Sequence, residues 1–312
     1  MNALQVDALV EFIKSQNEDE SFEYLAMSHL KMSALYWSLT ALFLLKGPDA
    51  LLYSPMTREE ILEFLQSCRN DDGGYGGDVG YDSHLLFTLS ALQVYKLLAV
   101  QPAQKERIES FILGLAREDG SFQGDAFGEV DTRFSYCALV SLHLLEFDFR
   151  TEDGAALLER SLKFVEQCRN WDGGFGAVPG AESHAGQIFC CQALLSLFQR
   201  KSDMDERLTE WLARRQVKES GGLNGRPQKL EDVCYSWWVL SALANLGKLD
   251  AIDQRALEEF ILRSQELEGP IADRPGDMGD IFHSFFGVAG LALLQRLPGT
   301  ESVDPIFCLP CE

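Results

Sequence analysis

Two kinds of apolar pattern alternate along the chain. In the first kind, apolar residues recur at helical spacing on one face only, as between Ile61 and Cys68, which follow a capping box of Thr57 and Glu60. In the second kind, a segment is apolar almost all round, which is typical of a helix buried on every side. The alternation therefore predicts half-exposed outer helices and buried inner helices.

The pattern predicts six helix pairs. The outer helices are expected near 4–15, 57–69, 104–116, 155–169, 205–216 and 253–265. The inner helices are expected near 30–46, 84–99, 133–146, 184–199, 234–247 and 281–294. A glycine-centred motif recurs about every 50 residues, at 72–76, 119–122, 172–176 and 220–223, and in degenerate form at 269–271. This regularity indicates a repeat architecture.

The terminal inner helices distinguish an open solenoid from a closed ring. An open solenoid would leave apolar faces exposed at both ends, whereas six apolar inner helices can bury one another by closing. We therefore predict an all-α fold in a single domain over residues 1–312. The predicted architecture is an α/α barrel, or toroid, of six helix pairs around a central apolar cavity.

Composition and charge exclude several classes of protein. The formal charge of −21 argues against a nucleic-acid partner, because phosphate contacts need clustered Lys and Arg. No run approaches the roughly 20 apolar residues of a membrane span, and the amino terminus lacks signal-peptide features. Most of the eight cysteines lie in apolar stretches, which indicates a reducing compartment. We expect a cytoplasmic protein without an integral membrane segment.

Residues in the first turns of the inner helices form a set. They are His84, Arg133, His184, Cys234 and His283, and they recur about every 50 residues. In a closed barrel they are expected to form one rim, beside helix N-termini whose free N–H groups favour anions. Three of the five histidines of the chain belong to this predicted rim.

One part of the rim carries potential zinc ligands. Asp232 and Cys234 begin one predicted inner helix, and His283 begins the next. Three protein ligands of these types with one open position are typical of a catalytic zinc site. The alternative is a capping aspartate, a core thiol and a satisfied core histidine. The shared register favours zinc, because adjacent inner helices bring the three positions together.

Cationic residues stand beside the same helix. Arg226 and Lys229 lie in the loop before it, and Tyr235 follows the cysteine. Arg can place two donors on a diphosphate and Lys adds a charge, so with His184 these residues could hold a leaving diphosphate. A solvated basic pair is the alternative.

Aromatic residues are frequent on the inner helices. They indicate an apolar ligand cavity, although ordinary core packing explains them equally well. The set is Tyr36, Trp37, Phe134, Tyr136, Phe189, Trp237, Trp238, Phe282, Phe285 and Phe286.

Four segments resemble the β subunits of protein prenyltransferases, most closely those of Rab geranylgeranyltransferase, the type II enzyme. They are Glu182-Ser-His-Ala-Gly-Gln187, Gly221-Gly-Leu-Asn-Gly-Arg-Pro227, Asp232-Val-Cys-Tyr-Ser-Trp-Trp238 and Ala272-Asp-Arg-Pro-Gly-Asp277. The resemblance runs from about His29 to Cys308. It implies an α/α barrel, which agrees with the repeat count.

The resemblance also implies roles for individual residues. The zinc ligands would be Asp232, Cys234 and His283, and the diphosphate contacts His184, Arg226, Lys229 and Tyr235. Trp237, Trp238 and Phe282 would line the isoprenoid funnel. Ser33 matches the position that sets chain length, where a small side chain suits the twenty-carbon geranylgeranyl group. Asp273 matches a position associated with magnesium in some relatives.

The implied function is that of a catalytic β subunit. It would transfer geranylgeranyl from geranylgeranyl diphosphate to C-terminal cysteine thiols of Rab GTPases through a zinc-bound thiolate. The implied partners are a prenyltransferase α subunit, a Rab substrate and a Rab escort protein that presents it. The implied cofactors are Zn²⁺ and, with Asp273, Mg²⁺.

Three alternatives to this function are open. The chain could be a CaaX-type prenyltransferase β subunit, a terpene cyclase that shares the barrel, or a non-catalytic α/α-barrel scaffold. A cyclase would need acidic motifs, and Asp203-Met-Asp-Glu206 only approaches one of them.

Two features depart from the family pattern. Gly269-Pro270-Ile271 replaces a double-glycine loop, which affects the loop near Asp273. The chain ends in Cys308-Leu-Pro-Cys-Glu312, which we expect to be a tail rather than a metal site.

Overall fold

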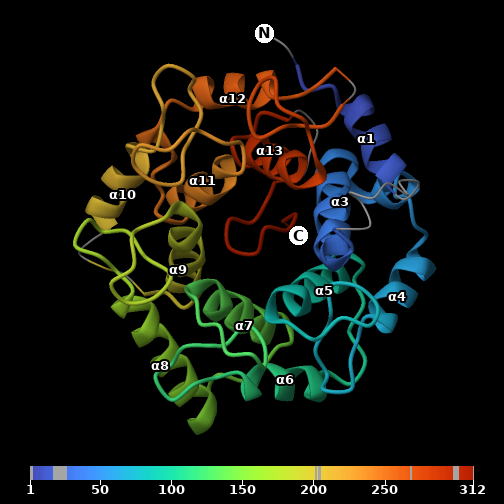
Figure 1. Cartoon of the computed structure of the whole chain (residues 1–312), viewed down its shortest axis with the longest axis vertical. Coiled ribbons are helices and arrows are strands. Elements are labelled where there is room, and N and C mark those ends of the chain that lie inside the picture. The colour runs from blue at the N-terminus through green and yellow to red at the C-terminus, as the bar shows by residue number, and fades with distance from the viewer. Residues whose placement is uncertain are drawn as a thin grey trace.

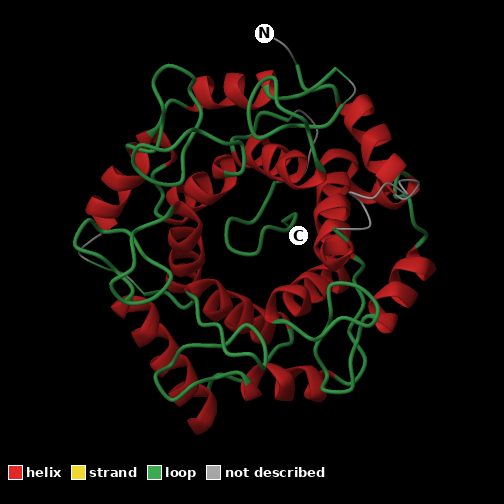
Figure 2. Cartoon of the chain, viewed as in Figure 1, coloured by secondary structure: helices red, strands yellow, loops and turns green. Residues whose placement is uncertain are grey.

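The chain forms a ring of helices in two layers (Figures 1 and 2). The computed structural model describes residues 3–16, 27–200, 202, 205–267, 269–297 and 302–311. The inner layer contains α3 (Lys31–Lys46), α5 (Leu85–Leu97), α7 (Thr132–Leu144), α9 (Ala185–Leu197), α11 (Tyr235–Asn245) and α13 (Ile281–Leu293). The outer layer contains α1 (Val6–Ser15), α4 (Arg58–Ser67), α6 (Lys105–Gly114), α8 (Glu152–Gln167), α10 (Asp205–Ala213) and α12 (Gln254–Arg263). Short 3₁₀ turns, η2 (Ser28–Leu30), η3 (Gly47–Leu52) and η4 (Leu249–Ala251), complete the described helical structure.

The inner helices close into a ring. Each packs against the next along the chain, and α13 packs against α3. Their side chains are buried on nearly all faces, because neighbours in the ring cover their flanks and the outer helices cover their backs. The predicted all-α barrel of six helix pairs is confirmed within the described residues. None of the described helices is long and apolar enough to cross a bilayer.

The glycine motifs join each repeat to the next outer helix. The first glycine of each motif has a positive φ, and its Cα lies against the backbone of that helix. A Cβ at Gly73 would lie 2.3 Å from the carbonyl oxygen of Arg107 in α6. A Cβ at Gly269 would lie 2.3 Å from that of Ala8 in α1, so the last motif closes the outer layer onto its first helix.

The degenerate motif keeps the geometry of the others. Gln265 pairs with Ile271 in an antiparallel bridge, as Arg69 pairs with Tyr75 in an earlier repeat. The departure at 269–271 therefore leaves the loop before Asp273 intact, because the retained Gly269 supplies the close approach that the motif requires.

Backbone hydrogen bonds fix the register of the repeats. The N–H groups of Leu85, Thr132, Ala185 and Val233 donate to carbonyls in the following repeat, those of Gly124, Ala177, Gly225 and Asp273. The residues just before these donors, His84, Asp131, His184 and Asp232, are therefore equivalent. Asp280 joins them, because its N–H donates to Ile271 as that of His84 donates to Tyr75.

This register corrects the predicted rim. Arg133 and Cys234 lie two residues beyond the equivalent position, and His283 lies three beyond it. The capping positions of the second and last of these repeats hold Asp131 and Asp280 instead. An interval of about 50 residues could not resolve this offset, because the loops differ in length.

Two further segments singled out in the sequence are the acidic stretch at 203–206 and the C-terminal residues. Asp203 and Met204 fall outside the described residues, and Asp205 begins the outer helix α10. The C-terminal residues 302–311 turn back into the ring (Figure 1). All eight cysteines are free, and only Cys311, in this segment, is exposed.

Candidate metal centre and anion site

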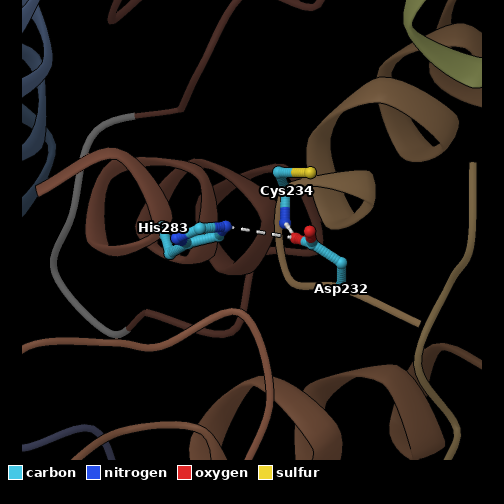
Figure 3. A group of neighbouring side chains, drawn as sticks. All are labelled: Asp232, Cys234 and His283. Atoms are coloured by element: carbon cyan, nitrogen blue, oxygen red, sulfur yellow. Dashed lines mark hydrogen bonds and ion pairs between the residues drawn. The ribbon is translucent and has the colours of Figure 1, made fainter. Parts of the chain in front are cut away.

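The three predicted zinc ligands meet at one place on the ring. Asp232 and Cys234 precede α11, His283 lies in the first turn of the neighbouring α13, and their ligand atoms lie within 4.8 Å of one another. Figure 3 shows the three side chains close together, with His283 pointing toward the carboxylate of Asp232. The distance from His283 Nε2 to Asp232 Oδ1 is 3.4 Å. No other group of three such side chains is this close in the described part of the chain.

The start of α11 explains the positions of two ligands. The backbone N–H of Cys234 donates to Asp232 Oδ1 over 2.7 Å, which holds the carboxylate against the helix start. Burial, with Asp232 adding to it, raises the pKa of Cys234 well above the usual thiol range. Oxygen, sulfur and nitrogen donors at this spacing fit a zinc ion with one open position.

Asp280 orients the third ligand, and the sequence analysis missed it. Its Oδ1 accepts the N–H of His283 over 2.8 Å, and its Oδ2 lies 2.7 Å from His283 Nδ1. When a metal replaces the proton on Nε2, this bond holds the remaining proton on Nδ1. Burial alone would lower the pKa of His283, but Asp232 and Asp280 outweigh it and raise this pKa to about 9. A capping Asp three residues before a candidate ligand was the available signal.

A group of hydrogen-bond donors lies beside the metal centre. His184 Nδ1 accepts the N–H of Gly186 over 3.1 Å, so the neutral ring carries its proton on Nε2. That nitrogen lies 3.3 Å from the hydroxyl of Tyr235, the residue after Cys234. Burial and then Arg226 lower the pKa of His184, and burial raises the pKa of Tyr235 to about 12. Both groups are therefore neutral donors at pH 7.

The loop before α11 supplies the cations. Arg226 forms an ion pair with Glu182, and Lys229 is exposed further along the same loop. A Cβ at Gly225 would lie 2.3 Å from the hydroxyl of Tyr235, so the glycine lets this loop lie directly over the tyrosine. The structure thus brings Arg226, His184 and Tyr235 together.

The predicted isoprenoid contacts differ in accessibility. Trp238 and Phe282 keep exposed surface, although both lie on inner helices, whereas Trp237 is fully buried. The ring of Phe282 packs on Trp37 at 5.1 Å, and Trp238 packs on Phe286 at 4.4 Å. Ser33 is buried, with its hydroxyl 3.3 Å from that of Ser90.

Asp273 is not one of the three residues of the metal-ligand group, although it is hydrogen-bonded to Val233, between Asp232 and Cys234. Its Oδ2 is 3.0 Å from Arg274 Nη2, and its backbone carbonyl accepts the N–H of Val233. Burial raises the pKa of its carboxyl, while Arg274 opposes the shift. A magnesium role for Asp273 stays a prediction.

Comparison with known proteins gives consistent matches. The family described as prenyltransferase alpha-alpha toroid domain matches residues 4–309. The chain is 46% identical over 313 residues to the geranylgeranyl transferase type-2 subunit beta of Saccharomyces cerevisiae, covering 96% of this chain and 92% of that protein. It is 45% identical over 315 residues to the type-2 subunit beta 1 of Arabidopsis thaliana, covering 100% and 95%.

A solved structure extends the match to the fold. It is the Candida albicans protein geranylgeranyltransferase-I complexed with GGPP, with a TM-score of 0.83 and 23% identity. The superposition covers 99% of this chain and 96% of that one. At this identity the likeness concerns the fold alone.

Proposed function

Since this chain belongs to the prenyltransferase α/α-toroid family, among the β subunits of geranylgeranyl transferase type 2, we propose that it is the catalytic subunit of a protein geranylgeranyltransferase. The proposed reaction moves a geranylgeranyl group from geranylgeranyl diphosphate to C-terminal cysteine thiols of Rab GTPases. One observation carries the proposal. The start of α11 gives Asp232 and Cys234 to the metal-ligand group and Tyr235, the next residue, to the donor group.

The acceptor thiol is the first requirement of the reaction. Asp232, Cys234 and His283 would hold Zn²⁺, with Asp280 keeping His283 in the required tautomer. Zinc in such a site lowers the pKa of a coordinated thiol, so that the acceptor sulfur is a thiolate at neutral pH.

The departing diphosphate is the second requirement. The acceptor sulfur forms a bond to C1 of the prenyl chain while the bond from C1 to the diphosphate oxygen breaks, and negative charge builds on the diphosphate. His184 Nε2–H and the Tyr235 hydroxyl would donate to that charge. Arg226 would exchange Glu182 for the diphosphate, and Lys229 would add a second cation. Preformed donors of this kind stabilise a transition state more than a ground state.

The prenyl chain needs an apolar surface next to these groups. Trp238, Phe282 and the adjacent Trp37 offer partly exposed aromatic faces on the inner helices. In the proposed complex, the small side chain of Ser33 leaves room for the twenty-carbon chain, and Trp237 supports the wall from behind.

The proposed setting follows from the family. The chain would work in the cytoplasm, where thiols are kept reduced, as the β subunit of a heterodimer with a prenyltransferase α subunit. A Rab escort protein would present the substrate. Mg²⁺ near Asp273 would assist the diphosphate.

Co-expression with an α subunit tests the proposal. The heterodimer is offered Rab and CaaX acceptors with farnesyl or geranylgeranyl diphosphate, and products are identified by mass spectrometry. We expect about one zinc per chain and geranylgeranyl transfer to Rab cysteines in the presence of the escort protein. Transfer to CaaX acceptors alone would identify a CaaX-type enzyme. A heterodimer that binds neither zinc nor prenyl diphosphate would instead support a non-catalytic scaffold.

A further inference from the structure

A buried arginine and a buried asparagine lie next to the loop that carries Arg226 and Lys229. They are Arg215, just after α10, and Asn224, at the start of that loop. The N–H of Asn224 donates to the carbonyl of Arg215 over 3.0 Å, and Arg215 Nη1 donates to Asn224 Oδ1 over 3.2 Å. The two residues are therefore joined through their backbones and through their side chains.

Trp211 of α10 holds the arginine side chain. The guanidinium carbon of Arg215 lies 4.4 Å from the centroid of the Trp211 ring, and Nε donates to the carbonyl of Trp211 over 3.2 Å. Burial lowers the pKa of Arg215, although Asp172 opposes this shift, and no carboxylate of the described residues forms an ion pair with it. A guanidinium buried without an ion pair is costly. Its position therefore depends on the bonds to Trp211 and Asn224.

Asn224 extends this constraint to residues 225–230, which we call the cation loop. Its Nδ2 donates to the carbonyl of Lys229 over 2.8 Å, and its backbone pairs with Glu231 in an antiparallel bridge. The N–H of Lys229 in turn donates to the carbonyl of Arg226 over 3.4 Å. The cation loop is thus closed by the bridge and tied across its width by one amide side chain.

The backbone beside this amide bond has a left-handed conformation. Gln228, just before Lys229, has a φ of 65°, whereas the corresponding turns of the other four glycine motifs have a glycine with positive φ. Those glycines are Gly80, Gly128, Gly180 and Gly276. A residue with a Cβ disfavours this conformation, so the bond from Asn224 to the next carbonyl helps to hold the turn.

The other glycine motifs lack this arginine–asparagine pair. Backbone hydrogen bonds identify the equivalent residues, because each motif has the same N–H to carbonyl bond as the pair. The donors are Gly76, Gln123, Gly176 and Ala272, and their acceptors are Cys68, Leu115, Cys168 and Ser264. None of these acceptor residues is charged, and the one amide among the donors, Gln123, is paired with a leucine. The pair therefore occurs in the one repeat that carries Arg226 and Lys229.

We propose that Arg215 and Asn224 are positioning residues, which hold the cation loop so that its arginine and lysine bind the diphosphate of the substrate together. The inference rests on the proposed function, since it concerns the anion site of that reaction. Asp232 follows the loop but is held by a different bond, from its N–H to the carbonyl of Leu223 over 3.0 Å. Loss of the pair should therefore weaken binding of the phosphates and leave the zinc ligands in place.

The test measures ligand affinities of heterodimers with the α subunit. Asn224→Ala removes both side-chain bonds of the asparagine, and Arg215→Met removes the guanidinium but keeps an unbranched apolar chain over Trp211. Arg214→Met is the control, because Arg214 is the adjacent residue but is exposed and paired with Glu210. Equilibrium binding is measured for geranylgeranyl diphosphate and for geranylgeraniol, which has the same chain without the phosphates. Zinc content is measured in each protein.

A second set of variants tests whether the pair acts through the cations. Arg226→Ala/Lys229→Ala removes both cations of the loop, and Asn224→Ala is then added to this double variant. If Asn224 positions the cations, its loss has little further effect once they are gone, because the two changes are not additive. If Asn224 only supports the fold, its loss weakens binding by the same factor in both backgrounds.

We expect Asn224→Ala and Arg215→Met to bind geranylgeranyl diphosphate about tenfold more weakly, and Arg214→Met to bind it as the wild-type protein does. Zinc content and affinity for geranylgeraniol should stay unchanged in all three. In the background without cations, Asn224→Ala should weaken binding of the diphosphate by less than about twofold.

Several outcomes would overturn the proposal. They are an unchanged diphosphate affinity in Asn224→Ala, a loss of zinc or of geranylgeraniol binding in this variant, and an equal loss of diphosphate affinity with and without the cations. An Arg215→Met protein that keeps wild-type affinity, or that forms no zinc-bound heterodimer, would overturn the part assigned to Arg215. A wild-type heterodimer that binds no isoprenoid diphosphate contradicts the proposed function itself, and the inference with it.

Discussion

Two inner helices, α5 and α9, begin with histidine caps, and the two inner helices of the metal centre begin with aspartates. His84 and His184 cap α5 and α9 through Nδ1, which accepts the N–H two residues ahead. Asp232 and Asp280 stand at the same register position before α11 and α13 and accept through a carboxylate oxygen. The capping bond is similar for the histidines and the aspartates. The polar atom of the side chain that does not take part in the cap differs between them.

That remaining atom sets what each cap can offer to a ligand. A capping histidine keeps a proton on Nε2 and offers a donor, which suits an anion. A capping aspartate keeps a second carboxylate oxygen: that of Asp280 orients His283, while Asp232 itself belongs to the metal group. One repeat position thus contributes His184 to the proposed anion-binding sector, and Asp232 and Asp280 to the proposed cation-binding sector beside it.

The largest expected effect comes from removing a ligand of the cation-binding sector. Cys234→Ser replaces a soft sulfur by a hydroxyl, which binds zinc poorly at neutral pH. We expect the purified heterodimer to lose its zinc, and transfer to fall by more than about a hundredfold, beyond the range for residues that only orient ligands. Metal analysis and single-turnover transfer measure the two effects.

The control for this variant is a core thiol of α9. Cys190 is buried at a similar level to Cys234 but lies away from the metal-ligand group. Cys190→Ser should retain zinc and transfer. A Cys234→Ser protein that is fully active without zinc would remove the basis of the zinc assignment.

The next effect comes from the cap itself. Asp280→Asn can still cap α13, but it removes the carboxylate that holds His283 Nδ1. We expect zinc affinity to fall about 10- to 100-fold, measured by competition with a chelator. Asp131→Asn makes the same change at the equivalent position of α7 and should leave zinc affinity unchanged. Equal losses in the two variants would mean that general helix destabilisation, not orientation of His283, is being measured.

The repeat pattern carried the prediction of the fold, and its limits are visible at the rim. Apolar periodicity is set by burial, so it located every helix pair and implied closure. Caps depend on side-chain orientation and on loop length, which periodicity does not encode. Spacing therefore grouped Arg133 with His84, although the equivalent residue is Asp131.

For the same reason, the sequence predicted some residues of the site and missed others. Asp232, Cys234 and His283 were gathered because α11 and α13 are consecutive inner helices that pack against each other. The role of Asp280 was not predicted, and neither were the side-chain hydrogen bonds to the backbone carbonyls of residues 305–308. These bonds join single side chains from four helices to main-chain carbonyls. Because main-chain carbonyls are the same in every sequence, no residue pattern marks them as acceptors.

A smaller effect is expected in the anion-binding sector. His184→Asn can still cap α9 but loses the Nε2–H donor. Because a hydrogen bond to a charged group contributes about 1.5–3 kcal/mol, geranylgeranyl diphosphate should bind roughly 10- to 100-fold more weakly, with zinc unchanged. His84→Asn removes the equivalent donor, which lies beside Gly124 and Phe134, away from Arg226, and should change this affinity little. Equilibrium binding measures both, and equal losses would contradict the division into sectors.

The smallest effect is the contribution of one histidine cap, His84, to the pH dependence of stability. Burial is the main cause that lowers the pKa of His84, and nearby Asp125 and Glu129 oppose it only in part. With the folded pKa below the unfolded value, the unfolded chain takes up this proton first as pH falls. The contribution of His84 is therefore fully present above about pH 6.5 and is lost as pH falls below it.

His84→Asn isolates this contribution, because asparagine keeps the cap and does not titrate. The melting temperature of the zinc-loaded heterodimer should fall less between pH 7.5 and pH 5.5 in the variant than in the wild-type protein. His184 and His143, whose pKa values burial also lowers, remain in both proteins and cancel in the comparison. A variant that loses as much stability as the wild-type protein would show that the capped ring of His84 accepts its proton without breaking the cap. The donor role assigned to the histidine caps would then no longer follow from their hydrogen bonds, since Nδ1 would not be held as an acceptor.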